Sequence, residues 1–313
     1  MLMVILDPNY QSYLKFLQTR FGQIEFIGAT CITELPTRAI QAQALICHPQ
    51  LGADYIDQQL LPNLCWVQSL FAGIEPLLKV QLPKECVLTN SRGMFGPLMS
   101  EYIFSYLLAN SQHHQIYSEQ QSAQLWQPAN YQSIASLKLA ILGAGSIAQH
   151  LAKTAKYFGM SVSAFSRSGN SPCPSFDHVY RIEQFNDYAT SADVVVAVLP
   201  STPQTQKICG SSFFDSLKRD CWFFNVGRGA CVDEDALLNW LQHNHCAQAI
   251  LDVTVEEPLP QGHPFWTQAN LRLTPHCAAP SLSQEISKLV ESNIEAFIRQ
   301  KALNCVVNID LAY

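Results

Sequence analysis

The sequence predicts an α/β protein built from two doubly wound domains with parallel sheets. Short apolar segments of strand length alternate with helical stretches along most of the chain, and this alternation is typical of parallel sheets covered by helices. The length of 313 residues also favours two domains, because single hydrophobic cores stop growing at roughly 250–300 residues. Hydrophobic residues make up 48% of the chain and charged residues 14%, which excludes a disordered, highly charged protein.

The first third of the chain supplies one of the two domains. Its clearest helical pattern lies around residues 13–17, and the segment 98–112 is almost uniformly apolar, as expected for a helix buried between two domains or two subunits. We therefore place the domain boundary near residue 97. The strands predicted before it cover residues 4–6, 24–27, 44–46, 66–68 and 87–89.

The alternation resumes after a polar stretch, 112–136, and forms the second domain. The chain then ends in a helix that begins near Ser281, which fits an S-x-x-Q capping box with Gln284, and we expect this helix to pack back on the first domain. The domains are thus 1–97 with 281–313, and 98–280. The strands predicted in the second domain cover residues 139–142, 161–165, 194–199, 222–225, 249–251 and 271–274.

A glycine-rich turn joins the first strand of the second domain to a helix. Gly143, Gly145 and Ala148 have the spacing G-x-G-x-x-(G/A), in which the first glycine makes the bend and the second lets backbone approach a pyrophosphate. Ser146 and Ile147 open the following helix, whose free N–H groups favour an anion. The turn predicts a dinucleotide site, and the alternative is a purely structural strand–helix turn.

Reactive side chains follow three of the later predicted strands. Arg228 stands in a glycine turn, Asp252 and Glu257 follow the next strand, and His276 follows the last. Each residue taken singly is more often a surface or satisfied polar group. Because ligands bind at the carboxyl ends of parallel strands, the three ends together predict a site that binds a carboxylate and moves a proton beside a hydride donor.

The order and spacing of these motifs resemble the D-isomer-specific 2-hydroxyacid dehydrogenase family, and within it the glyoxylate/hydroxypyruvate reductase branch. The resemblance covers about the last two thirds of the chain and is looser in the first third, where it rests on residues 69–74 and 99–102. The segments that carry it are 140–148, LPSTPQTQ at 199–206, NVGRGACVDEDAL at 225–237, LDVTVEEPLP at 251–260 and TPHCAA at 274–279.

The resemblance implies a Rossmann dinucleotide-binding domain inserted in a flavodoxin-like substrate domain, and a role for each reactive residue. Arg228 would bind the substrate carboxylate and polarise its keto oxygen, Glu257 would hold the imidazole, and His276 would be the general acid. The backbone at Ala72 and Gly73 would complete the carboxylate clamp. The residues implied to contact the cofactor are Asp252 at the nicotinamide carboxamide and Leu199, Pro200 and Val226 along the cleft.

The second strand of the dinucleotide unit predicts which cofactor is used. An NAD site usually has Asp or Glu at this strand end to bind the ribose hydroxyls. This chain instead has Ser166, Arg167 and Ser168, and no carboxylate before Asp177. A guanidinium between two hydroxyls suits a 2′-phosphate, so NADP(H) is preferred and NAD(H) is possible; the alternative is an exposed turn arginine.

Charge and cysteine usage limit the other classes of function. The net charge of −6 and pI near 5.8 predict no nucleic-acid partner. We also expect no membrane segment and no signal peptide, and the odd number of 11 cysteines without a C-x-x-C pair favours a reducing, cytoplasmic location. We expect no metal site, because His243, His245 and Cys246 do not converge at a helix end.

We therefore interpret the chain as a reductase that converts a small 2-keto acid, of the glyoxylate or hydroxypyruvate type, to the D-2-hydroxy acid with NAD(P)H. An NAD-linked dehydrogenase of another D-2-hydroxy acid is the first alternative. A nucleotide-sensing protein without turnover is the second, because fold alone does not decide activity. The apolar segment 98–112 and the resemblance predict a homodimer.

Overall fold

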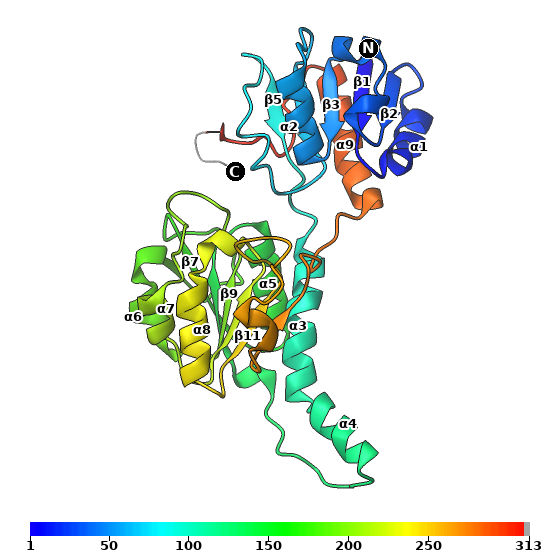
Figure 1. Ribbon diagram of the computed structural model, residues 1–313. Coiled ribbons are helices and arrows are strands. Elements are labelled where there is room, and N and C mark those ends of the chain that lie inside the picture. Colours follow the sequence, from blue (N-terminus) through cyan, green and yellow to red (C-terminus); the bar gives the residue numbers. More distant parts are fainter. Residues whose placement is uncertain (310–313) are drawn as a thin grey trace. The chain divides into compact units, whose positions relative to one another are not determined.

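A computed structural model describes residues 1–309, which divide into two compact units (Figure 1). The first unit contains Met1–Met94 and the chain from Ser281 onward, and the second contains Phe95–Pro280. The first boundary falls slightly before the predicted residue 97 because the helix that opens the second unit already begins at Gly96. Within the described residues, every helix falls short of the length and apolarity needed to cross a bilayer.

The first unit has a fully parallel sheet in the order β2-β1-β3-β4-β5. This is the flavodoxin-like order, with one reversal of strand sequence at the first strand. The strands are β1 (Leu2–Leu6), β2 (Glu25–Ala29), β3 (Ala44–Cys47), β4 (Trp66–Ser69) and β5 (Val87–Thr89), and the helices are α1 (Tyr10–Arg20), α2 (Pro49–Gln58) and α9 (Ser283–Ile298).

Alternating side chains of β1 show why helices cover both faces of this sheet. Val4 and Leu6 belong to one buried cluster and Met3 and Ile5 to another, because successive strand residues point to opposite faces. The second cluster also contains Ile286, Val290 and Ile294 of α9, all fully buried. The expectation that the last helix returns to the first unit is therefore confirmed.

The predicted capping box at the start of α9 is wrong. The helix begins at Ser283 with Leu282 as its N-cap residue, and no side chain caps it. Ser281 consequently lies one residue before the cap, where its hydroxyl is out of register with the N–H groups of the first turn.

The second unit has a seven-stranded parallel sheet in the order β12-β11-β10-β9-β6-β7-β8. Counted from β6, this is the Rossmann order with one further strand at the edge, and the direction of winding reverses between β6 and β9. The strands are β6 (Lys138–Leu142), β7 (Ser161–Ser166), β8 (His178–Arg181), β9 (Val194–Ala197), β10 (Trp222–Asn225), β11 (Gln248–Leu251) and β12 (Leu271–Leu273).

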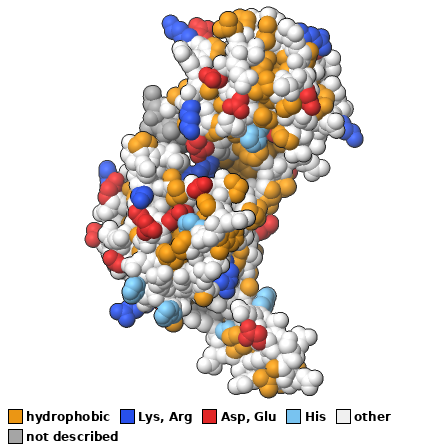
Figure 2. Space-filling view, in the orientation of Figure 1, with side chains coloured by type: hydrophobic (Ala, Val, Ile, Leu, Met, Phe, Trp, Pro, Cys, Tyr) orange, Lys and Arg blue, Asp and Glu red, His pale blue; other side chains and the backbone are white. Residues whose placement is uncertain are grey.

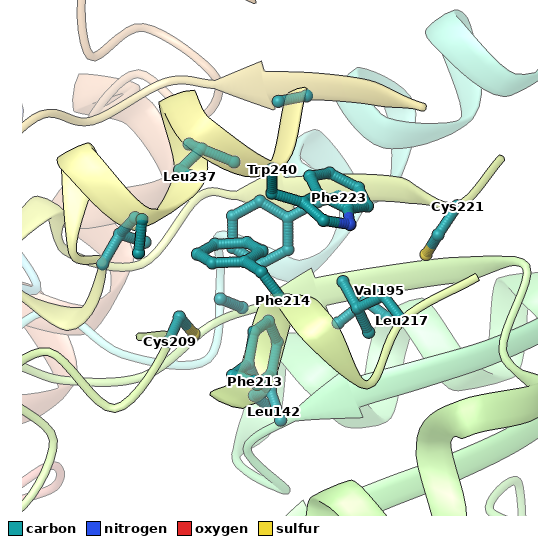
Figure 3. Packing of buried hydrophobic residues seen from close by; sticks show 14 of the residues in the cluster. Leu142, Val195, Cys209, Phe213, Phe214, Leu217, Cys221, Phe223, Leu237 and Trp240 are labelled. Atoms are coloured by element: carbon teal, nitrogen blue, oxygen red, sulfur yellow. The ribbon is translucent and has the colours of Figure 1, made fainter. Parts of the chain in front are cut away.

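Helices cover both faces of this second sheet (Figure 1). One face packs against α3 and α5, and the other against α7 and α8. On the latter face the rings of Phe213, Phe214, Phe223 and Trp240 meet edge to face or stacked, as Figure 3 shows. The helices are α3 (Gly96–Ser111), α4 (His114–Ser122), α5 (Ser146–Tyr157), α6 (Phe185–Tyr188), α7 (Ser211–Asp215) and α8 (Glu234–His243).

Candidate active site

The glycine turn between β6 and α5 has the geometry of a pyrophosphate cradle. Gly143 has φ +118°, a conformation that side chains rarely adopt, and it donates its N–H to the Phe165 carbonyl at 2.7 Å. A Cβ at Gly145 would meet nothing within 4 Å, so open space lies over the start of α5. Ser146 and Ile147 form the first turn of that helix, whose N–H groups lack intrahelical acceptors. These features fit a dinucleotide pyrophosphate.

The end of β7 carries hydroxyls and a cation where an NAD site usually has an acid. The Ser166 hydroxyl accepts the Gly169 N–H at 3.1 Å, and the Ser168 hydroxyl accepts the Asn170 N–H at 3.3 Å, which shapes a tight turn around the exposed Arg167. The first carboxylate after it, Asp177, is bound at the opposite end of the strand.

One side chain and one backbone N–H group fix Asp177 at that opposite end. It accepts from Lys156 Nζ at 2.6 Å and from the Val162 N–H at 2.7 Å. Partial burial opposes its ionisation, yet these two donors outweigh burial and hold the pKa of Asp177 below its ordinary value of 3.8. Asp177 is therefore bound at the start of β7, away from the end of the strand. The groups predicted to lie next to the cofactor ribose remain Ser166–Ser168.

The ends of β9 and β10 come into close contact through Gly227. A Cβ there would lie 2.7 Å from both backbone N and O of Leu199, so only glycine fits. Leu199 and Val226 are more than nine-tenths buried and belong to clusters on opposite faces of the sheet, while Pro200 is half-buried. Their contact with a cofactor stays a prediction.

A buried asparagine shapes the turn that carries Arg228. The Asn225 Oδ1 accepts the Gly227 N–H at 3.1 Å, and its Nδ2 donates to the Arg228 carbonyl at 3.0 Å. The side chain of Asn225, 1% exposed, thus bridges the turn from below. The half-buried Arg228 donates from Nη1 to the Gly227 carbonyl at 2.8 Å. Asn225 was not among the residues predicted from the sequence, although a polar residue at the end of a buried strand is a signal that could have identified it.

The glycines on either side of Arg228 act through close packing, not through unusual backbone angles. Neither has a positive φ, but a Cβ at Gly229 would overlap the Thr254 carbonyl. Thr254 belongs to the loop that holds Glu257, and its N–H donates to Glu257 Oε1 at 3.1 Å. The absence of a side chain at Gly229 therefore allows the Arg228 turn to contact the Glu257 loop.

The two residues predicted to act as proton donor and as its partner are hydrogen-bonded to each other. The Nδ1 of His276 lies 2.7 Å from Oε2 of Glu257. Because an ionised carboxylate only accepts hydrogen bonds, Nδ1 carries the hydrogen and Nε2 is the atom left to exchange a proton with a substrate. His276 has φ +51°, in the left-handed region, where a non-glycine residue is uncommon and often functional.

Asp252 holds the turn on which His276 lies. Its carboxylate, 2% exposed, accepts from the Thr274 hydroxyl at 2.6 Å and from the N–H groups of Cys277 and Ala278 at 2.8 and 3.0 Å. The Asp252 carbonyl accepts the His276 N–H at 2.9 Å. This structural role of Asp252 was not predicted from the sequence, and its implied contact with a nicotinamide carboxamide stays a prediction.

The remaining predicted residues, Ala72 and Gly73, belong to the first unit. They are half-buried in the loop after β4, where Asn90 donates from Nδ2 to the Ala72 carbonyl at 2.8 Å. Their contact with a substrate carboxylate stays a prediction. The second unit links the loops of Arg228, Glu257 and His276 to one another through the Gly229–Thr254 and Glu257–His276 contacts.

Known proteins resemble this chain over nearly its full length. Residues 104–278 match the family described as D-isomer specific 2-hydroxyacid dehydrogenase, NAD binding domain. A glyoxylate/hydroxypyruvate reductase A from Serratia proteamaculans is 33% identical over 266 residues, which cover 84% of this chain and 80% of that protein.

Solved structures agree. A D-isomer specific 2-hydroxyacid dehydrogenase family protein from Aeromonas salmonicida superposes with a TM-score of 0.90, 35% identity and 99% coverage of both chains. An NADPH-dependent glyoxylate/hydroxypyruvate reductase from Sinorhizobium meliloti, in complex with NADP and sulfate, has a TM-score of 0.86, 25% identity and complete coverage of both chains. The chain therefore belongs to the D-isomer specific 2-hydroxyacid dehydrogenase family and is an NAD(P)-dependent oxidoreductase that acts on 2-keto and 2-hydroxy acids.

Proposed function

We propose that this enzyme reduces glyoxylate, hydroxypyruvate or a similarly small 2-keto acid to the D-2-hydroxy acid, with NADPH as the preferred donor. The 2.7 Å contact between His276 and Glu257 carries the proposal, because reduction of a ketone needs a proton donor held in one orientation. The glyoxylate/hydroxypyruvate reductases from Serratia and Sinorhizobium support the choice of substrate.

Each catalytic side chain has a task that follows from its chemistry. The bound nicotinamide supplies the hydride. His276, doubly protonated, donates from Nε2 to the substrate oxygen as that oxygen becomes negative, and Glu257 stabilises the imidazolium and fixes the ring. Arg228 binds the carboxylate and the keto oxygen with its planar fork, which a lysine would match poorly. The backbone of Ala72 and Gly73 is proposed to bind the same carboxylate.

The preference for NADPH rests on the end of β7. Arg167 stands between the hydroxyl-bearing Ser166 and Ser168, and the next acid, Asp177, is bound to Lys156. A guanidinium with flanking hydroxyls favours the 2′-phosphate of NADP(H). The free ribose hydroxyls of NAD(H) are usually bound by a carboxylate instead.

The function is tested by following the absorbance of reduced cofactor against a panel of 2-keto acids, with NADPH and NADH in parallel. We expect turnover with the smallest keto acids and a higher kcat/KM with NADPH. Turnover confined to NADH and larger acids would support a different 2-hydroxyacid dehydrogenase. Cofactor binding without consumption, measured by calorimetry on the same preparation, would instead identify a nucleotide sensor.

We further propose a homodimer formed through α3 and the projecting segment beyond it. His113, with φ 55°, separates α3 from α4, and α4 with the following chain stands off the body of its unit in Figure 1. Glu119 is the only Asp, Glu, Lys or Arg in 112–133, and the projection is correspondingly poor in charge in Figure 2. The large apolar side chains exposed there are Ile116, Tyr117, Leu125, Trp126 and Tyr131.

An exposed apolar projection of this kind usually marks a protein–protein interface. Sedimentation equilibrium should give twice the 34.9 kDa chain mass, and Trp126→Ala with Leu125→Ser should shift the equilibrium toward monomer. A monomeric wild type would refute the dimer. We also propose a cytoplasmic location, supported by 11 cysteines that are all free thiols, as expected in a reducing compartment.

A further inference from the structure

A chain of hydrogen bonds runs from helix α3 to the turn that carries His276. The Tyr102 hydroxyl lies 2.7 Å from Thr274 Oγ1, and Thr274 Oγ1 lies 2.6 Å from Asp252 Oδ1. Tyr102 is half-buried on α3, a helix to which the sequence analysis assigned no residue of the site. The bonds therefore connect a helix outside the catalytic loops with the loop of the general acid.

The direction of these bonds follows from hydrogen-bonding chemistry. An ionised carboxylate can only accept, so Thr274 must donate its single hydroxyl hydrogen to Asp252. Thr274 Oγ1 can then only accept from Tyr102, which makes the phenol the donor. Burial raises the pKa of Tyr102, so the phenol keeps its proton in the working range of the enzyme.

Asp252, at the end of this chain of bonds, fixes the backbone of the proposed general acid and of the two residues after it. Its carboxylate accepts the N–H groups of Cys277 and Ala278, and its carbonyl accepts that of His276. These bonds hold His276 at its left-handed φ of 51°, a strained conformation for a non-glycine residue that persists only where surrounding contacts enforce it. A change in the rotamer of Thr274 or Asp252 would therefore move the imidazole.

We propose that Tyr102 is a positioning residue for the reduction: its hydroxyl orients Thr274, and through Thr274 and Asp252 it holds the His276 turn so that the imidazole meets Glu257. The proposal rests on the proposed function, in which His276 is the general acid. Tyr102 itself touches neither of the two catalytic side chains by any hydrogen bond in the described residues.

The first test measures the turn without using activity. In Tyr102→Phe, the N–H groups of residues 276–278 should exchange with deuterium on the order of 10-fold faster than in the wild type, because their acceptor Asp252 is no longer held. Amides of β6 and β10 should be unchanged. Tyr55→Phe is the matched control, because the Tyr55 hydroxyl is buried in the first unit and has no hydrogen-bond partner among the described residues.

The second test separates positioning from general stability. Tyr102→Phe should lower kcat for keto-acid reduction on the order of 10-fold, while KM for the acid and the Kd of NADPH stay within about twofold. Thr274→Ser keeps the hydroxyl and should retain most of kcat, whereas Thr274→Val should resemble Tyr102→Phe. Adding Tyr102→Phe to Thr274→Val should cost little more, because both changes break the same chain of bonds.

Wild-type kcat and wild-type exchange at 276–278 in folded Tyr102→Phe would overturn the proposal. If Tyr102→Phe fails to fold, the two Thr274 variants provide the test. Equal kcat in Thr274→Ser and Thr274→Val would overturn the proposal as well. His276→Ala distinguishes failure of the proposed function from failure of the proposed role of Tyr102. If His276→Ala turns over normally, the proposed general acid is wrong; if it is inactive while Tyr102→Phe is normal, only the role of Tyr102 fails.

Discussion

Gly229 and Thr254 lie at neighbouring strand ends, so close together that a Cβ at position 229 would overlap the Thr254 carbonyl. The contact joins the turn of Arg228 to the loop of Glu257. Arg228 and Glu257 can therefore keep their present relative positions only while residue 229 has no side chain.

Gly229→Ala should consequently damage catalysis more than folding. The obstacle is backbone, which cannot rotate away as a side chain can, so the Glu257 loop must shift, and we expect kcat/KM to fall on the order of 10²-fold. Steady-state kinetics and thermal unfolding on the same preparation check this. Gly22→Ala is the control, because a Cβ at Gly22 meets nothing within 4 Å. Unchanged kcat/KM in Gly229→Ala would show that the contact does not set the site.

Glu257→Gln should lower the rate of reduction. The Glu257 carboxylate lies 2.7 Å from Nδ1 of His276, where it is proposed to fix the imidazole ring and to stabilise its positive charge, and an amide keeps the acceptor but removes the negative charge. We expect kcat/KM for reduction to fall on the order of 10²-fold, with the Kd of NADPH little changed. Steady-state kinetics and cofactor titration of wild type and variant test this; unchanged kcat/KM would mean that the charge of Glu257 does not assist the proton donor.

Arg228→Gln removes the charge proposed to bind the substrate. The interaction strengthens as the keto oxygen becomes negative, so kcat/KM should fall by a factor on the order of 10² to 10⁴, with unfolding temperature little changed. Arg228→Lys should restore only part of the loss, since an ammonium lacks the planar fork. Near-normal turnover of the Gln variant would place the carboxylate elsewhere.

Arg167→Asp tests the choice of cofactor. The new carboxylate repels a 2′-phosphate and can accept hydrogen bonds from ribose hydroxyls, so the ratio of kcat/KM for NADPH over that for NADH should fall, and the preference for NADPH should shrink or reverse. Binding of 2′-phospho-ADP-ribose and ADP-ribose, measured by calorimetry, gives the same ratio without turnover. If neither ratio changes, Arg167 is an ordinary surface residue.

Asp177→Asn should destabilise the protein only above acidic pH. The folded-state pKa of Asp177 lies below its ordinary value of 3.8, so its contribution is present above that value and is lost as the pH falls through the lower, folded-state pKa. With both partners of the Lys156 ion pair 37% exposed, we expect a loss of about 1 kcal/mol at neutral pH. Urea unfolding at neutral and strongly acid pH checks this, with Asp187→Asn as an exposed control.

Local pattern was sufficient to predict most strands and the residues at their ends. Buried parallel strands are continuous apolar runs, which the sequence shows directly. The G-x-G turn and the motifs around Arg228, Glu257 and His276 are short contiguous segments, so the residue types within each segment indicate its chemistry. Strand β8 was missed because its four residues are half-buried or exposed at a sheet edge and show no apolar run. Helix α4 was missed because it buries no side chain and therefore has no apolar face to detect.

The sequence by itself determined the two parallel-sheet units and the glycine turn, and it predicted Arg228, Glu257 and His276 as the reactive groups at the strand ends. Only the tertiary structure decided how these groups are held. Asn225 under the Arg228 turn, the close approach of Gly229 to Thr254, and the bonds from Tyr102 through Thr274 to Asp252 join residues from different strands and helices. Such contacts depend on distances between segments remote in the chain, and no local periodicity encodes a distance of that kind.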